Sequence, residues 1–124
     1  MTYEITRADM RLKVERALHD GGDLYTFDDI MALIKEGKMQ SFTSGDTWIV
    51  TQVNEFPRKK VLEIALVVGN IWEAIEFLPE IYDYARQVGA TRVTGFGRDG
   101  WWEHHDAGWK KVGTMYAKDM HYDA

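Results

Sequence analysis

The chain has 124 residues, of which 45% are hydrophobic and 13% aromatic; it contains no cysteine and has a net charge of −5. This length is typical of a single domain, and the apolar content excludes a disordered chain. The acidic charge disfavours nonspecific nucleic-acid binding, although Arg58-Lys59-Lys60 and Lys110-Lys111 form local basic clusters. The absence of cysteine excludes a disulfide framework and a thiolate metal site, and it fits a reducing cytoplasm.

The N-terminal part, residues 1–37, predicts a pair of helices. Thr6 with Asp9, and Thr26 with Asp29, have the spacing of a helix-capping box. Apolar residues recur at helical spacing after each start, at Met10, Val14, Ala17 and Leu18 and then at Phe27, Ile30, Met31 and Ile34. The polar N-terminus does not resemble a secretory signal, and no apolar stretch approaches the roughly 20 residues of a membrane span, so we expect no membrane association.

Residues 38–69 change to a two-residue period, which predicts strands. Gln40–Thr43 and Thr47–Val53 are expected to pair as antiparallel strands around a turn at Ser44-Gly45-Asp46. After a polar loop that contains Pro57, the run Val61–Val68 is almost wholly apolar and rich in β-branched residues. Such a run predicts a central strand that is buried on both faces.

Residues 70–124 predict a long helix, a strand, a short helix and a closing strand. Asn70 is a candidate N-cap of a helix over Ile71–Val88, which we expect to continue, kinked, through Pro79. The other expected elements are a strand at Thr91–Thr94, a short helix or turn at Trp101–Asp106 and a last strand over Lys110–Lys118. A helix that joins two strands of one sheet makes them parallel, and ligands tend to bind at the carboxyl ends of such strands.

This order of elements resembles the GCN5-related N-acetyltransferase (GNAT) superfamily over about residues 24–120. The strongest local match is Trp102–Gly113, which is similar to the family's aromatic-rich short helix, its Gly-aromatic pair (here Gly108-Trp109) and its closing strand. The resemblance implies one α/β (α+β) domain over residues 1–124, with a mixed central sheet and helices on both faces. It also implies that the two parallel strands separate, here after Leu66, and leave a wedge below the start of the long helix.

In that family, acetyl-coenzyme A lies in the wedge, and backbone amides of an Arg/Gln-x-x-Gly-x-Gly/Ala loop hold its diphosphate. Helix N-termini suit this role because they expose unpaired N–H groups. This chain departs from the loop motif, since it has one glycine, no arginine and a bulky Trp72, and Glu73 adds a like charge that costs on the order of 1 kcal/mol near a dianion. The resemblance nevertheless places the cofactor candidates at Val67, Val68, Gly69, Asn70, Ile71 and Trp72, with Arg98 in the glycine-rich turn as a further contact to an anion.

Three residues are candidates for acid–base chemistry. Glu63 interrupts the apolar strand, on the face that we expect to carry Val61, Ala65 and Val67, and a buried carboxylate there would have a raised pKa suited to a general base. Family members often carry a base on this strand; the alternative is an ion pair of Glu63 at the strand's exposed start. His104 stands where the family often has a tyrosine that protonates the leaving thiolate, or it is an exposed helix residue. Tyr116 is a further candidate acid, or a core residue.

Two other patterns lie near the C-terminus. In Glu103-His104-His105-Asp106, neighbouring side chains point in different directions, so we expect no metal site. Trp101, Trp102 and Trp109 are close in sequence, and those that the core does not take would form an exposed surface for a protein partner.

Two functions remain open from the sequence. The first is transfer of an acetyl group from acetyl-coenzyme A to a primary amine by direct attack, since no cysteine exists to carry an acyl intermediate. The second is a non-catalytic GNAT-like binding or structural module. The chain is similar, in size and in its missing loop motif, to compact GNAT-like proteins of tailed bacteriophages, and this resemblance implies a place in the host cytoplasm or the virion.

Overall fold

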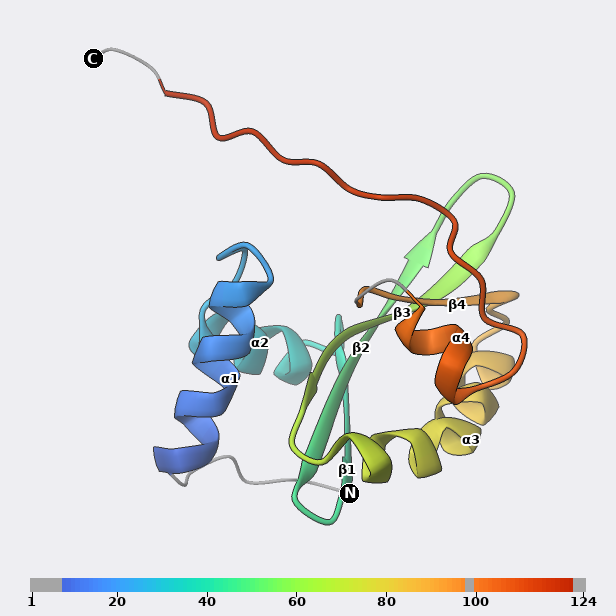
Figure 1. Cartoon of the computed structure of the whole chain (residues 1–124), viewed down its shortest axis with the longest axis horizontal. Helices are drawn as coiled ribbons and strands as arrows, with labels where there is room; N and C mark the ends of the chain where they lie inside the picture. The colour runs from blue at the N-terminus through green and yellow to red at the C-terminus, as the bar shows by residue number, and fades with distance from the viewer. Residues whose placement is uncertain (1–7, 98–99, 122–124) are drawn as a thin grey trace.

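The computed structural model describes residues 8–97 and 100–121, which form one mixed sheet with helices on both faces (Figure 1). The strand order is β1-β2-β3-β4, in which β4 pairs with β3 in parallel and the other pairs are antiparallel. The elements are α1 (Ala8–Asp20), α2 (Phe27–Lys35), β1 (Gln40–Ser44), β2 (Thr47–Glu55), β3 (Lys60–Val68), α3 (Ile71–Gln87), β4 (Arg92–Gly95) and α4 (Trp101–His105). The expected fold class, with its parallel central pair, is confirmed.

The helix starts follow from local side-chain chemistry. Thr26 and Asp29 form the predicted capping box of α2, in which each side chain accepts a hydrogen bond from the other residue's backbone N–H. Asn70 caps α3 as predicted, and α3 passes through Pro79 as one helix. The predicted start signal at Thr6 lies outside the described residues.

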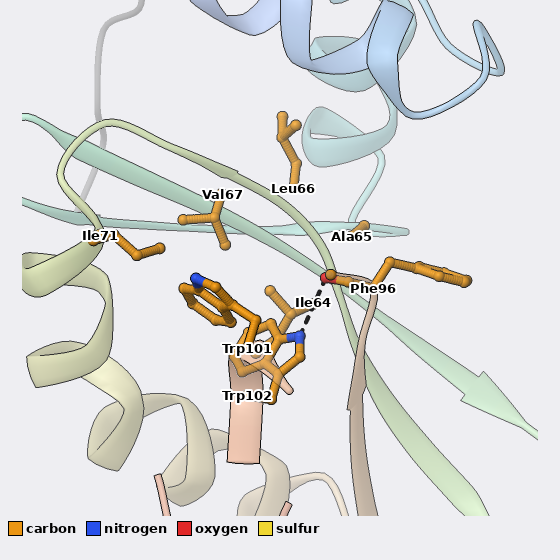
Figure 2. A pocket seen from close by; sticks show the side chains of 9 residues that line it. Ile64, Ala65, Leu66, Val67, Ile71, Phe96, Trp101 and Trp102 are labelled. Carbon is orange, nitrogen blue, oxygen red and sulfur yellow. Dashed lines mark hydrogen bonds between the residues drawn. The ribbon is translucent and has the colours of Figure 1, made fainter. Parts of the chain in front are cut away.

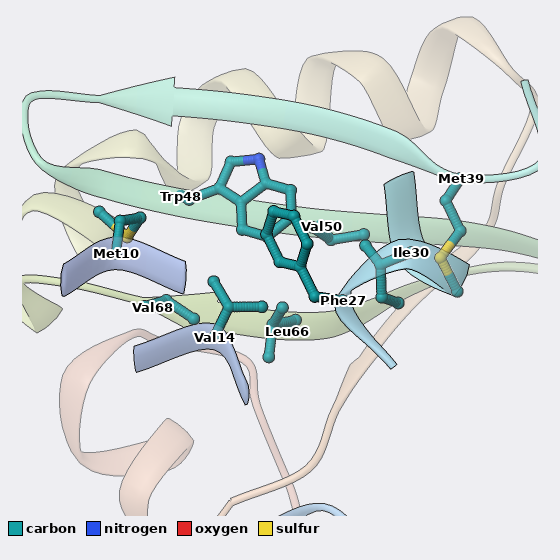
Figure 3. Close-up of a cluster of buried hydrophobic side chains, with 9 residues drawn as sticks. All are labelled: Met10, Val14, Phe27, Ile30, Met39, Trp48, Val50, Leu66 and Val68. Atoms are coloured by element: carbon teal, nitrogen blue, oxygen red, sulfur yellow. The ribbon is translucent and has the colours of Figure 1, made fainter. Parts of the chain in front are cut away.

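Two hydrophobic clusters hold the helices against the sheet. On one face, α1 and α2 bury a cluster around Trp48, which is fully buried (Figure 3). On the other face, α3 buries a second cluster around Leu62 and Ile81, and Trp102 and Trp109 pack at its edge. Because both faces of β2 and β3 are covered, these strands carry apolar residues without strict alternation.

An extra residue in β3 decides which face each of its side chains takes. Val50 pairs with Leu66 and Thr51 with Ile64, so Ala65 has no partner of its own and forms a β-bulge. Before the bulge, Leu62 and Ile64 lie in the α3 cluster; after it, Leu66 and Val68 lie in the α1–α2 cluster. The expectation that Glu63 shares a face with Val67 is therefore wrong, because an uninterrupted two-residue alternation does not hold across position 65.

The predicted closing strand at Lys110–Lys118 is also wrong. Residues 110–121 are exposed and belong to no strand, and Figure 1 shows this segment running away from the sheet. A strand needs a partner for its backbone groups, and among residues 8–97 and 100–121 the neighbouring β4 pairs only with β3. Within the described part of the chain, no helix is long and apolar enough to cross a membrane.

Candidate functional site

The two parallel strands diverge at their carboxyl ends. The pairing of β3 with β4 ends at Ile64 and Gly95, whereas β3 continues to Val68 beside β2 alone. The separation thus begins at Ile64, earlier in the strand than the expected Leu66. A cavity of about 320 Å³ occupies the gap, and we call it the wedge cavity; it is lined by residues 64–67 of β3 together with Ile71, Phe96, Gly97, Trp101 and Trp102.

The walls of the wedge cavity are apolar and aromatic. Figure 2 shows Ile64 and Val67 pointing toward Trp101 and Trp102 of α4, while Leu66 points to the opposite side of the sheet. The side chain of Phe96 stands at the rim and is 66% exposed. Its backbone carbonyl accepts a hydrogen bond of 3.1 Å from the indole N–H of Trp102, which fixes this wall.

Glycines make room for that indole. A Cβ atom added at Gly95 would lie 2.6 Å from Cζ2 of Trp102, and one at Gly97 would lie 3.0 Å from its Nε1. Both glycines belong to the glycine-rich turn that the sequence predicts before α4. Positions 95 and 97 also have to be glycine because the indole of Trp102 packs against them. The sequence pattern alone did not indicate this contact.

The start of α3, beside the wedge cavity, is occupied by the protein's own polar groups. The Asn70 side chain accepts hydrogen bonds from the N–H groups of Trp72 (2.8 Å) and Glu73 (3.4 Å). The Thr47 hydroxyl lies 3.1 Å from a carboxylate oxygen of Glu73 and accepts a hydrogen bond from the Asn70 N–H. The other Glu73 oxygen would lie 1.8 Å from a Cβ atom added at Gly45 in the β1–β2 turn, so this carboxylate covers the turn.

Gly69 is required by the same turn. Its φ angle is +119°, and an added Cβ atom would lie 2.6 Å from the carbonyl oxygen of Asp46 and 2.8 Å from the Cα atom of Thr47. The β1–β2 turn and the residues before α3 are therefore in direct backbone contact. This contact leaves no open loop at Gly69 that a ligand could enter.

Comparison with solved structures identifies the architecture, whereas no protein-family model and no curated protein matches the sequence. An aminoglycoside acetyltransferase from an uncultured soil metagenomic sample, solved in complex with sisomicin, superposes with a TM-score of 0.64 at 9% identity, covering 89% of this chain and 88% of that one. A protein described as a probable acetyltransferase gives 0.58 at 10% identity, covering 89% of both chains. The protein TTHA1254 from Thermus thermophilus gives 0.55 at 11% identity, covering 100% of this chain and 99% of that one.

The chain has the GNAT-like fold. At these identities the likeness concerns the architecture, so the site of this GNAT-like protein has to be judged from its own residues. Of the six contiguous cofactor candidates, Val67 and Ile71 line the wedge cavity, while Val68 is buried in the α1–α2 cluster. Trp72 is 63% exposed, with its ring 5.4 Å from that of His105, and Arg98 lies outside the described residues.

The start of α3 does not fit the diphosphate of coenzyme A. Asn70 already takes two N–H groups of the first turn, Gly69 is held against Asp46 and Thr47, and the Glu73 carboxylate lies over the turn that faces them. An incoming dianion would have to displace the cap and approach a like charge in partly buried surroundings. The apolar wedge cavity remains, and no charged side chain lines it among the residues that the structure describes.

The three acid–base candidates lie apart from one another, and none of them lines the wedge cavity. Glu63 accepts a hydrogen bond of 2.9 Å from the Asn54 side chain, on the side of the sheet opposite Leu62 and Ile64. It faces a separate open groove of about 590 Å³ with Arg58 and Arg92. His104 is exposed on α4, and Tyr116 is 89% exposed in the C-terminal segment.

A polar cluster of Tyr82, Asp106 and Trp109 lies behind α4 and was not predicted from the sequence. The Tyr82 hydroxyl donates a hydrogen bond to the Asp106 carboxylate, and the Trp109 indole N–H lies 2.9 Å from the Tyr82 oxygen and 3.0 Å from the Asp106 oxygen. Burial, together with the Asp106 hydrogen bond, raises the pKa of Tyr82 to about 12. The cluster ties the chain after α4 to α3. No sequence pattern links Tyr82 to residues more than twenty positions away, so only the fold brings them together.

Proposed function

We propose that this GNAT-like chain is a non-catalytic binding module whose wedge cavity takes an apolar segment of a protein partner. The observation that carries the proposal is the self-occupied start of α3, where Asn70, Glu73 and the β1–β2 turn take the place of the cofactor's diphosphate. Without that anchor, the wedge cavity retains only its apolar and aromatic binding surface.

The chemistry of the wedge cavity suits large apolar side chains. A volume of about 320 Å³ is at the small end of ligand sites, and its walls are Ile, Val and Trp side chains. Phe96 and Trp72 extend the aromatic surface outward and are 66% and 63% exposed. Exposed aromatic residues around an apolar hollow are typical of the buried centre of protein interfaces.

Titration with acetyl-coenzyme A tests the non-catalytic part of the proposal. Because a ligand at about 100 times its Kd stabilises the native state by about 2.7 kcal/mol, a bound cofactor would raise the thermal midpoint clearly. We expect no shift with millimolar acetyl-coenzyme A or coenzyme A. A clear shift of the thermal midpoint in the wild-type protein would overturn the proposal.

Peptide selection tests the binding part. We expect the protein to enrich peptides with closely spaced Trp, Phe, Leu or Met residues, and Phe96→Asp to reduce the affinity for them at least tenfold. Leu24→Asp is the matched control, since Leu24 is 77% exposed in the α1–α2 connection, away from the wedge cavity. Equal losses for both variants, or no enrichment, would contradict a site at the wedge.

Acetyl transfer to a primary amine is the second candidate, favoured by the divergence of β3 and β4 after Ile64 and Gly95. The chain itself has no cysteine, so a thiol reagent would report released coenzyme A without background. Steady release that depends on an added amine, and that Glu63→Gln or His104→Gln lowers at least tenfold, would support this function over the first.

A further inference from the structure

A basic groove lies on the part of the sheet that α1 and α2 leave open. These two helices cover the end of the sheet around Trp48 and Val68, whereas the β2–β3 hairpin projects away from them (Figure 1). The uncovered part holds the open groove of about 590 Å³, which we call the hairpin groove. It lies on the side of the sheet opposite Leu62 and Ile64, so the sheet separates it from α3 and from the wedge cavity.

The register of three strands builds the floor of the hairpin groove. Asn54 of β2 pairs with Val61 of β3, and Val61 pairs with Arg92 of β4. Paired residues direct their side chains to the same face of a sheet, and so do residues two positions apart on one strand. Glu63 and Thr94, which pair with each other two positions further along β3 and β4, therefore continue this face.

The turn of the hairpin adds two cations and an aromatic ring to this surface. The backbone N–H of Phe56 donates a hydrogen bond of 2.9 Å to the carbonyl oxygen of Lys59, which closes the turn. Arg58 and Lys59 line the groove together with Arg92, and Phe56 beside them is 58% exposed. These three cations and the carboxylate of Glu63 give the groove a net charge of +2, whereas the whole chain carries −5, which leaves −7 for the rest.

The three cations of the groove are not neutralised by carboxylates of the described chain. Lys60, the next residue along, pairs with Glu55 at 3.2 Å. Within residues 8–97 and 100–121, no carboxylate forms an ion pair with Arg58, Lys59 or Arg92. Like charges around one groove repel one another, and a bound anion offsets that repulsion. The groove is therefore electrostatically suited to an anionic ligand.

The charge outside the groove distinguishes between kinds of anionic ligand. The net −7 of the remaining chain repels a long polyanion such as a nucleic acid, whose binding depends on an extended basic surface. A short acidic peptide needs only the local cations, because an arginine guanidinium forms two parallel hydrogen bonds with one carboxylate. The exposed ring of Phe56 offers an apolar contact next to these cations.

We propose that the hairpin groove is a second binding site, which takes a short acidic peptide segment of a protein partner. Carboxylates of the segment bind Arg58, Lys59 and Arg92, and an apolar side chain next to them packs on Phe56. The site lies across the sheet from the wedge cavity, so it does not depend on what the wedge cavity binds.

Fluorescence anisotropy of a labelled peptide, with four glutamates around one leucine, tests the preference for carboxylates. We expect saturable binding at about 20 mM salt and weaker binding at about 200 mM, because salt screens exposed charges. The same peptide with glutamine in place of glutamate should bind at least tenfold more weakly, and a labelled single-stranded oligonucleotide of equal charge should also bind more weakly. No preference for glutamate over glutamine, or tighter binding of the oligonucleotide, would overturn the proposal.

Charge variants locate the site on the molecule. Arg92→Glu in β4 and Arg58→Glu in the hairpin turn should each weaken binding of the glutamate peptide at least tenfold. Lys13→Glu is the matched control, since it makes the same change of charge at an exposed position of α1 and should alter the affinity less than twofold. Glu63→Gln should strengthen binding, because it removes a negative charge from the groove. Circular dichroism establishes that each variant folds. Equal losses for the groove variants and Lys13→Glu, or weaker binding by Glu63→Gln, would overturn the proposal.

Discussion

Gly69 carries the tightest backbone contact described around the start of α3. Replacement by alanine should lower the free energy of unfolding by about 3 kcal/mol, since φ is +119° and the new Cβ atom would meet backbone atoms of Asp46 and Thr47 at 2.6 and 2.8 Å. Urea unfolding measures the change. Gly37→Ala is the control, because Gly37 also has a positive φ (+77°) but nothing lies within 4 Å of its added Cβ, so only about 1–2 kcal/mol is expected. An equal loss of unfolding free energy in the two variants would contradict the backbone contact at Gly69.

Because of Tyr82, the free energy of unfolding should fall at high pH. Its pKa in the folded state is raised from 10.0 to about 12, so the folded state keeps a proton that the unfolded state releases. The contribution of this proton to the free energy of unfolding is therefore constant at neutral pH and is lost as the pH rises from 10 to 12. Absorbance of phenolate at 295 nm should show a titration step near pH 12.

Tyr82→Phe should remove that late step. At pH 7 it should also cost about 1 kcal/mol, since the hydroxyl bonds to both Asp106 and Trp109. The absence of a step near pH 12 in the wild-type protein would contradict the raised pKa of Tyr82.

Among the elements, α4 depends on one side chain. This helix has five residues and none of them is buried, so the contacts of Trp102 with Phe96, Gly95 and the stacked ring of Trp109 hold it in place. Trp102→Ala should lower the free energy of unfolding by about 2 kcal/mol, less than for a fully buried Trp, and should open the wedge cavity. Hydrogen exchange at residues 101–106 should become faster. Leu24→Ala, which truncates an exposed side chain in the α1–α2 connection, should leave the exchange of this helix unchanged.

Most elements could be predicted from the sequence because their signals are local. The caps at Thr26 and Asn70 depend on residues two or three positions away, and the apolar run of β3 depends on the two layers that cover it. The bulge at Ala65 could not be predicted, because an apolar run on both faces reads the same with or without an extra residue. The predicted strand at residues 110–118 was wrong for a different reason. Alternation of apolar and polar residues shows that a segment can pair as a strand, but not whether a partner strand is present.

The position of the wedge between the two parallel strands could be predicted from the sequence. The wedge follows from a parallel pair at the end of a crossover helix, and the sequence identified both strands. The role of Glu73 depends on a contact with Thr47 and the β1–β2 turn, which no spacing along the chain reveals. Trp102 was recognised as aromatic, but its position against Gly95 and Gly97 depends on how the chain folds back.

At the scale of the whole molecule, two layers share one sheet. Val14 on the α1–α2 side and Ile81 on the α3 side are both fully buried. Val14→Ala should cost about 2 kcal/mol and Ile81→Ala about 3 kcal/mol, because each leaves a cavity. Neither layer has another surface to bury against, so each variant should still unfold in a single step.

Two probes measure that cooperativity. Fluorescence of Trp48, isolated by replacing the other four tryptophans with phenylalanine, reports the first layer, and far-ultraviolet circular dichroism at 222 nm reports all helices, including α3. Their urea transitions should coincide in the wild-type protein and in both variants. A fluorescence transition that precedes the dichroism transition in Val14→Ala would mean that the α1–α2 layer detaches by itself.

The bulge at Ala65 sets which changes of length the central strand can accept. Deleting that residue would remove the bulge and leave every face as it is, because Ile64 and Leu66 would then alternate directly, with Ile64 on the α3 side and Leu66 on the α1–α2 side. A deletion in the β2–β3 connection, at Arg58 for example, would shorten a loop and leave every face as it is. Relatives of this chain are therefore expected to vary in length both at the hairpin and at the position of the bulge.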